Sequence, residues 1–157
     1  MAEALAVMHW RVRCDAFDVE FVLGSSPKLR ARCALTTWNR EPGDDNNNNT
    51  NPECLQRAVQ VWLLDFNQVG NITMDEEGVD KAVRGLWDND PYYPRPACHE
   101  TNTTEVRLWE AFKDVYLAAS VGIRADTSLP LSFIAKVEKE ATARSAKAIA
   151  GKKKQRH

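Results

Sequence analysis

The spacing of apolar residues changes along the chain and sets the expected fold class. Residues 59–66 read Val-Gln-Val-Trp-Leu-Leu-Asp-Phe, a β-branched and aromatic run that predicts a strand. Residues 19–23 form a shorter β-prone run, which the turn-forming residues 24–27 are expected to close. Beyond Phe66 the apolar residues recur every three or four positions, which is the helical period. The sequence therefore predicts an α+β fold, mostly α, in one domain over residues 1–157, with a two-stranded hairpin and then three helices.

The three expected helices have recognisable ends. The first begins at a capping box, Thr73-Met-Asp-Glu76, in which the threonine and glutamate side chains satisfy backbone N–H groups. It ends before the proline-rich segment 89–96, because a proline disfavours helical geometry in the preceding residue. The second helix is expected over Glu105–Ser120 and the third over Pro130–Ala150, with Gly151 as its stop. The side chains expected to face the core are Val79, Ala82, Val83, Leu86, Trp87, Leu108, Trp109, Phe112, Val115, Tyr116, Ala119, Leu131, Phe133, Ile134 and Val137, with Trp62 on the strand.

The rest of the chain is less regular. Residues 2–9 resemble the last turns of an amphipathic helix with Leu5, Met8 and His9 on one face. Because the chain would then begin inside a helix, we expect that a segment is missing upstream. Residues 29–38 are interpreted as a second short strand, and the Asn-rich run 41–52 as a disordered insertion. Tyr92 to Pro96 is expected to pack as an extended loop, and residues 151–157 to form a frayed basic tail.

Charge and hydropathy exclude several classes of protein. The chain has 21 Lys and Arg against 22 Asp and Glu, a formal net charge of -1, which excludes a globally basic nucleic-acid binder and an acidic tail protein. No apolar run approaches the roughly 20 residues of a membrane span. The N-terminus also lacks the basic region and cleavage site of a secretory signal. We therefore expect an intracellular protein of the cytoplasm or nucleus, with no membrane partner.

The four cysteines are widely spaced. None forms a Cys-x-x-Cys pair, and Cys98-His99 is the one Cys/His doublet. A structural zinc site usually needs ligands in close pairs, so free or buried thiols are expected and a zinc site is not.

Three acidic residues lie in a pattern that could carry chemistry. Asp15 follows a helix end at His9, Glu20 lies five positions later, and Asp65-Phe66 ends the apolar strand. This order resembles the catalytic half, or C-terminal lobe, of a protein kinase-like fold. The resemblance implies that Asp15 is the base toward a substrate hydroxyl. It implies that Asp65 and Glu20 hold the Mg²⁺ that bridges the phosphates of ATP.

The sequence departs from that pattern at several positions. Arg13-Cys14 replaces His-Arg before the aspartate, Phe17 stands where a lysine would contact phosphate, and Asn67 replaces the glycine after Asp-Phe. The chain contains no Gly-rich phosphate loop and no Val-Ala-x-Lys strand. The N-terminal nucleotide lobe is therefore expected to be missing, and an active enzyme is not expected.

A narrower resemblance involves more of the chain. The runs Trp62–Phe66, Thr73–Glu76 and Asn89–Pro96 resemble a fungal domain family of unknown function whose members are often described as zinc finger proteins. The likeness covers Ala2–Leu23 and Val59–Leu131. The resemblance implies a protein of unknown function. It does not imply a zinc site, because the spacing of the cysteines and histidines described above does not support one.

Three functions follow from these observations, in order of preference. The first is an inactive kinase-like interaction or regulatory module (a pseudokinase) that binds protein partners and needs no cofactor. The second is a truncated, Mg-ATP-dependent phosphotransferase with Asp15 as base and Asp65 and Glu20 as metal ligands. The third is a nucleic-acid-associated protein that uses the basic tail 151–157. Aspartate is also common in turns and caps for purely structural reasons, and this explanation of Asp15 and Asp65 stays open.

Overall fold

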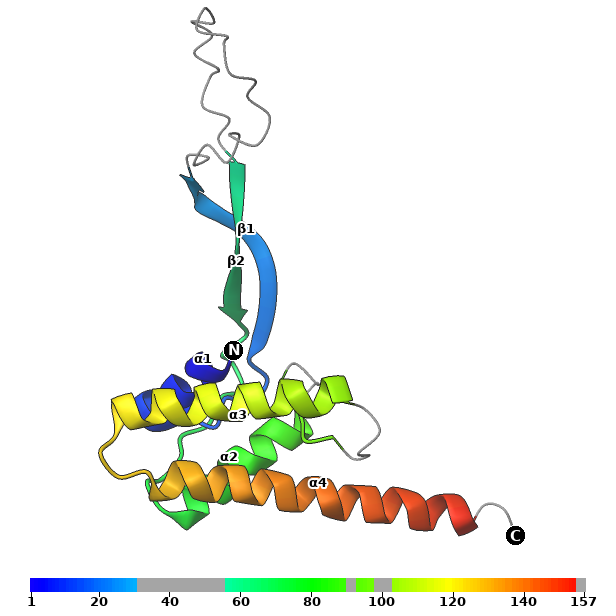
Figure 1. Cartoon of the computed structure of the whole chain (residues 1–157). Coiled ribbons are helices and arrows are strands. Elements are labelled where there is room, and N and C mark those ends of the chain that lie inside the picture. Colours follow the sequence, from blue (N-terminus) through cyan, green and yellow to red (C-terminus); the bar gives the residue numbers. More distant parts are fainter. Residues whose placement is uncertain (31–55, 90–92, 98–102, 155–157) are drawn as a thin grey trace, which may run out of the picture. The chain divides into compact units, whose positions relative to one another are not determined.

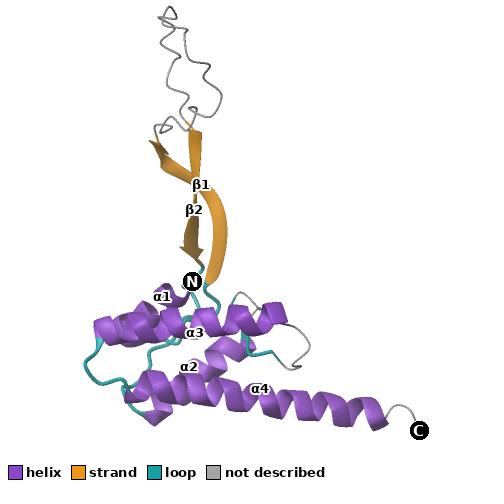
Figure 2. Cartoon of the chain, in the orientation of Figure 1, coloured by secondary structure: helices purple, strands orange, loops and turns teal. Residues whose placement is uncertain are grey.

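The computed structural model describes residues 1–30, 56–89, 93–97 and 103–154. Figures 1 and 2 show a mostly helical architecture. Strands β1 and β2 pair in a two-stranded sheet within the described residues, and the expected α+β class is confirmed. The elements are helix α1 (Ala2–Val7), a π-helical turn (Met8–Val12), strands β1 (Glu20–Arg30) and β2 (Gln56–Leu64), and helices α2 (Glu76–Asp88), α3 (Thr103–Ile123) and α4 (Ser128–Lys154). The expected Asn-rich insertion lies outside the described residues, as does most of the expected strand 29–38.

The chain divides into two compact units. The helical unit comprises Met1–Glu20 and Leu64–His157, and the hairpin unit comprises Phe21–Leu63. None of the helices in the described ranges is long and apolar enough to cross a membrane.

The hairpin unit consists of β1 paired with β2, as expected from the two β-prone runs. The turn predicted at residues 24–27 is wrong, because β1 continues through it to Arg30. Gly24 has a packing role instead: a Cβ there would lie 2.9 Å from Cδ1 of Trp62 on β2, so glycine makes room for the indole. Pro27 is tolerated because β1 is an edge strand among the described residues.

The helical unit is built on three helix pairs, in which α1 packs on α3, α2 on α4, and α3 on α4. Its centre is aromatic. The ring of Tyr116 lies 5.1 Å from that of Phe133, and Trp109 stacks on Phe112 at 5.7 Å. Leu5, Met8 and His9 are buried on one face of the N-terminal helix, as the sequence predicted. Tyr93 is buried edge-on against Phe112, which agrees with a packed loop there.

The helix faces were only partly predictable. Trp109, Phe112 and Tyr116 of α3 are buried as expected, and so are Phe133, Ile134 and Val137 of α4. The predictions for Leu108, Val115 and Leu131, and for Trp62 on β2, are wrong, since all four side chains are exposed. Helix α3 carries apolar residues on more than one face, and periodicity cannot say which face the other helices cover.

Two helix ends also differ from expectation. The N-cap of α2 is Asp75 rather than Thr73, and its carboxylate accepts from the Gly78 N–H at 3.0 Å. Glu76 does not reach back to the cap, because it forms an ion pair with Lys136 of α4. Helix α4 continues through Gly151 to Lys154, since an interior glycine costs a helix only about 1 kcal/mol relative to alanine.

Candidate functional site

The segment that leads from the π-helical turn to β1 has an unusual backbone. Arg13, Ala16 and Asp18 have φ values of 65°, 52° and 64°, and Asp65 has a φ of 61°. Residues other than glycine pay roughly 1–2 kcal/mol each for this left-handed geometry. Such residues cluster at functional sites when the surrounding structure holds them in place. The strained positions lie near Asp15 and on Asp65, two of the residues that the sequence predicted to carry chemistry.

Asp15 is only 6% exposed and its carboxylate joins three segments. Oδ1 accepts hydrogen bonds from the backbone N–H of Phe17 at 3.1 Å and of Gly70 at 2.9 Å. Oδ2 lies 3.4 Å from Nζ of Lys81 on α2, and that ammonium also donates to the Asn71 carbonyl at 2.8 Å. The carboxylate therefore holds its own turn, the segment after β2 and helix α2 together.

The backbone around Asp15 is equally constrained. Its N–H donates to the Gly70 carbonyl at 2.9 Å, and the Ile72 N–H donates to the Arg13 carbonyl at 2.9 Å. A Cβ on Gly85 of α2 would lie 2.6 Å from the Asp15 carbonyl oxygen. Glycine at position 85 therefore lets α2 approach the turn closely enough to support it.

Two further titratable side chains near Asp15, those of His9 and Cys14, have shifted pKa values. His9 is fully buried, and its Nδ1 lies 2.9 Å from Oη of Tyr116. Burial lowers the pKa of His9 to about 3, although the charge and backbone of Asp15 act in the opposite direction. Burial likewise raises the pKa of the Cys14 thiol. Both side chains are therefore neutral in the folded chain at neutral pH.

A cavity of about 180 Å³ opens beside the carboxylate. Its lining residues are Asp15, Phe17, Lys81, Arg84, Gly85 and Asp88. Sites for drug-sized ligands occupy roughly 300–1,000 Å³. The cavity at Asp15 is therefore of a size for an ion or one side chain of a partner.

The sequence predicted Glu20 and Asp65 as metal ligands and Asp15 as a base beside them. The described residues contain no group of three or more His, Cys, Asp and Glu placed to hold a metal ion, and Asp15, Glu20 and Asp65 all belong to those residues. Asp65 is exposed and Glu20 is half-buried. Their roles as Mg²⁺ ligands, and that of Asp15 as base, stay predictions.

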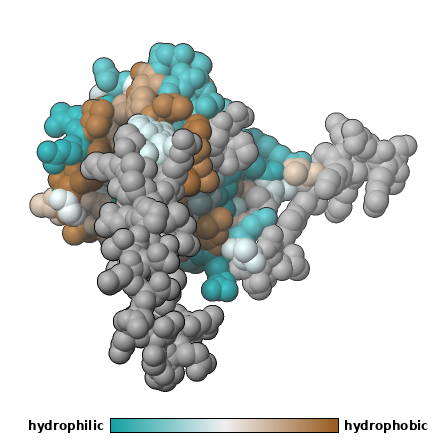
Figure 3. Space-filling view, turned by 90° about the horizontal axis from the view of Figure 1, so that it is seen from above, coloured by the Kyte–Doolittle hydropathy of each residue, from teal (hydrophilic) through white to brown (hydrophobic). Residues whose placement is uncertain are grey.

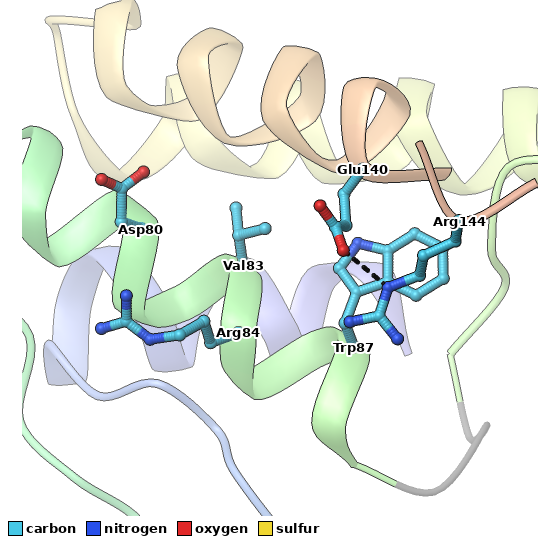
Figure 4. A pocket seen from close by; sticks show the side chains of 6 residues that line it. All are labelled: Asp80, Val83, Arg84, Trp87, Glu140 and Arg144. Carbon is cyan, nitrogen blue, oxygen red and sulfur yellow. Dashed lines mark hydrogen bonds and ion pairs between the residues drawn. The ribbon is translucent and has the colours of Figure 1, made fainter. Parts of the chain in front are cut away.

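A second cavity, of about 230 Å³, lies between α2 and α4 and was not predicted (Figure 4). Two guanidinium groups lie over the indole of Trp87, that of Arg144 at 4.8 Å and that of Arg95 at 5.1 Å from the ring centre. Glu140 accepts from Nε of Arg144 at 2.8 Å and fixes it over the ring. The cation–π contact of Arg144 with Trp87 joins α4 to α2 and stabilises their packing. The sequence feature that indicates the ion pair at this cavity is the i, i+4 spacing of Glu140 and Arg144 on a helix.

Residues 61–128 match the family model of DUF3669, a domain of unknown function described as "Zinc finger protein". The matched segment runs from within β2 to the start of α4. It lies inside the Val59–Leu131 range in which the sequence resembled such a family. No curated protein and no solved structure matches the chain. Cys98 and His99, the Cys/His doublet of the matched segment, lie outside the described residues.

Proposed function

We propose that this chain is a protein-interaction or regulatory module, related to the C-terminal lobe of a kinase-like fold, which does not transfer phosphate by itself. The main observation behind this proposal is the set of contacts made by the Asp15 carboxylate. A general base must lie within hydrogen-bond reach of the proton that it removes. Oδ1 of Asp15 already accepts two backbone N–H groups, and Oδ2 faces the Lys81 ammonium. The carboxylate thus has a structural task that accounts for all of its contacts.

Exposed apolar side chains support an interaction role. They occur on both strands and on α3, and Figure 3 shows several apolar groups among hydrophilic ones on the face seen from above. The exposed members are Val22, Leu23, Val59, Val61, Trp62 and Leu64 on the strands and Val106, Leu108, Val115 and Val121 on α3. Apolar residues that gather on a surface are typical of protein-binding sites.

One observation favours the second candidate, a Mg-ATP-dependent phosphotransferase. The left-handed residues concentrate around Asp15 and at Asp65, where a strained backbone would be expected in an active site. In that case Asp15 would act as base and would have to exchange its Lys81 contact for a substrate hydroxyl. Asp65 and Glu20 would hold Mg²⁺, which neutralises the charge that develops on the phosphates.

Thermal unfolding with and without Mg-ATP separates the two candidates. A ligand that binds only the folded chain stabilises it by about 2.7 kcal/mol at a hundredfold excess over Kd, which raises Tm. For an interaction module we expect the Tm to be unchanged by Mg-ATP. A rise in Tm that disappears in Asp65→Asn, but persists in the control Asp114→Asn on α3, would overturn the proposal.

The structural role of Asp15 has its own test. Asp15→Ala removes the acceptor for two backbone N–H groups, and buried donors left without a partner cost about 1–3 kcal/mol. We expect urea unfolding to show that loss in Asp15→Ala and almost none in Asp114→Ala, because Asp114 is exposed. Equal stability of the two variants would mean that Asp15 is not a scaffold residue.

A further inference from the structure

The cavity between α2 and α4 has a buried hydrogen-bond donor among its lining residues. Trp87 is only 8% exposed, and its Nε1–H donates to no acceptor among the described residues. Figure 4 shows the indole nitrogen on the edge of the ring that faces Val83 and Glu140. A buried N–H without a partner is uncommon, because it has lost its hydrogen bond to water and gained none in return. The indole therefore lacks an acceptor at a cavity of about 230 Å³.

The two acidic side chains that line this cavity already have partners. Glu140 accepts from Nε of Arg144 at 2.8 Å, and a carboxylate oxygen of Asp80 lies 2.5 Å from Nζ of Lys136. Each carboxylate is thus neutralised by a cation of α4, and neither accepts from the Trp87 indole. The acceptor that this N–H lacks is therefore not supplied by the carboxylates of the cavity itself.

The indole is held in place without any ligand. The guanidinium groups of Arg144 and Arg95 lie 4.8 Å and 5.1 Å from its ring centre. Arg95 in turn donates to the Asn89 carbonyl at 2.9 Å, which ties it to the end of α2. A donor that is already positioned loses little conformational entropy when it binds an acceptor. The Trp87 N–H is therefore preorganised for a hydrogen bond.

Arg84 supplies the same cavity with a positive charge. Its side chain lines the cavity from α2 and is exposed, and no hydrogen bond or ion pair involves it among the described residues. Arg84 and Trp87 are three positions apart on α2, and residues at that spacing are neighbours on a helix surface. An anion that accepts from the indole N–H is therefore within reach of this guanidinium.

We propose that the α2–α4 cavity binds one carboxylate side chain from an acidic segment of a partner protein, which accepts from the Trp87 N–H and pairs with Arg84. This proposal rests on the proposed function and names the chemistry of the partner. The volume suits one side chain, because it is below the roughly 300–1,000 Å³ of sites for drug-sized ligands. A carboxylate fits better than a phosphate dianion, since Asp80 and Glu140 repel a double charge more strongly than a single one.

An NMR titration of the full chain can follow the Trp87 indole N–H directly, with its resonance assigned from Trp87→Phe. The probe is the peptide acetyl-Ala-Ala-Glu-Ala-Ala-amide, taken to high millimolar concentration. We expect the Trp87 resonance to move downfield and to saturate, because the proton gains an acceptor. The indole N–H of Trp10, which is buried but does not line the cavity, should not move. The same peptide with glutamine in place of glutamate should bind at least roughly tenfold more weakly, because it lacks the charge.

A pair of variants tests the charge. Arg84→Gln should weaken binding of the glutamate peptide by at least roughly threefold, which is the size expected for an exposed ion pair. Arg107→Gln is the matched control, since Arg107 is an exposed arginine of α3 that does not line the cavity. It should leave binding unchanged. Both arginines are on the surface, so neither change removes packing from the core.

The proposal is overturned if the Trp87 resonance does not move, if the two peptides bind equally, or if Arg84→Gln and Arg107→Gln have equal effects. Inorganic phosphate is the probe for the other anion, and tighter binding of phosphate than of the glutamate peptide would overturn the assignment to a carboxylate. An unmoved Trp87 resonance with no Mg-ATP response in Tm would refute the carboxylate site and leave the interaction module intact. A Mg-ATP response would count against the module whatever the peptides do.

Discussion

His9 links the stability of the helical unit to pH. The ring is fully buried, with Nδ1 2.9 Å from Tyr116 Oη and the Phe133 ring 4.8 Å away, edge-on. Burial lowers its pKa from 6.5 to about 3, although the Asp15 charge and backbone oppose the change. Between those two pH values the unfolded chain binds a proton at His9 and the folded chain does not. Stability must therefore rise with pH through this window and fall as the pH is lowered.

The size of the effect follows from the pKa difference. Each pH unit below the unfolded pKa of 6.5 removes about 1.36 kcal/mol until the folded pKa is reached. Lowering the pH from 7.5 to 5 should thus reduce the free energy of unfolding by about 2 kcal/mol. Folding lowers the pKa values of Asp75, Glu76 and Asp126, so their contributions are lost only as the pH falls below about 4, the ordinary range of carboxyl groups. A measurement at pH 5 is therefore dominated by histidine.

Urea unfolding at the two pH values, for the wild type and for His9→Gln, measures this contribution. The glutamine does not titrate, so the variant should lose about 2 kcal/mol less than the wild type on acidification. His99 and His157 are present in both proteins and cancel in the comparison. If the wild type and His9→Gln lost the same free energy, His9 would not be held neutral by burial, and the reasoning would be refuted.

Two further predictions concern packing. Gly85→Ala should destabilise the fold by about 1–3 kcal/mol in chemical unfolding, because its Cβ would meet the Asp15 carbonyl at 2.6 Å. Gly122→Ala, with nothing within 4 Å, should stabilise the fold by about 0.5–1 kcal/mol, and stabilisation by Gly85→Ala as well would contradict the close approach of α2. Phe133→Ala should cost about 3–5 kcal/mol, while Leu131→Ala, at a side chain that is 53% exposed, should cost under about 0.5 kcal/mol; similar losses would mean that Leu131 packs in solution.

The candidate site shows what local patterns can and cannot predict. The acidic residues Asp15, Glu20 and Asp65 were visible in the sequence because of their order relative to helix ends and strands. Their contacts were not visible. Lys81 meets Asp15 because α2 packs against the turn, and that approach depends on glycine at position 85. No spacing rule relates residues so far apart along the chain.

The sequence by itself determined the element types and their order, because the 2- and 3.6-residue periods are local properties of the backbone. It also determined the buried face of the N-terminal helix and the strand character of β2. Only the tertiary structure decided which apolar faces are covered, since Leu108 and Trp109 are equally apolar neighbours and burial depends on where the other helices lie. It also decided that the Asp15 carboxylate holds three segments together, because hydrogen bonds between segments exist only once the chain has folded.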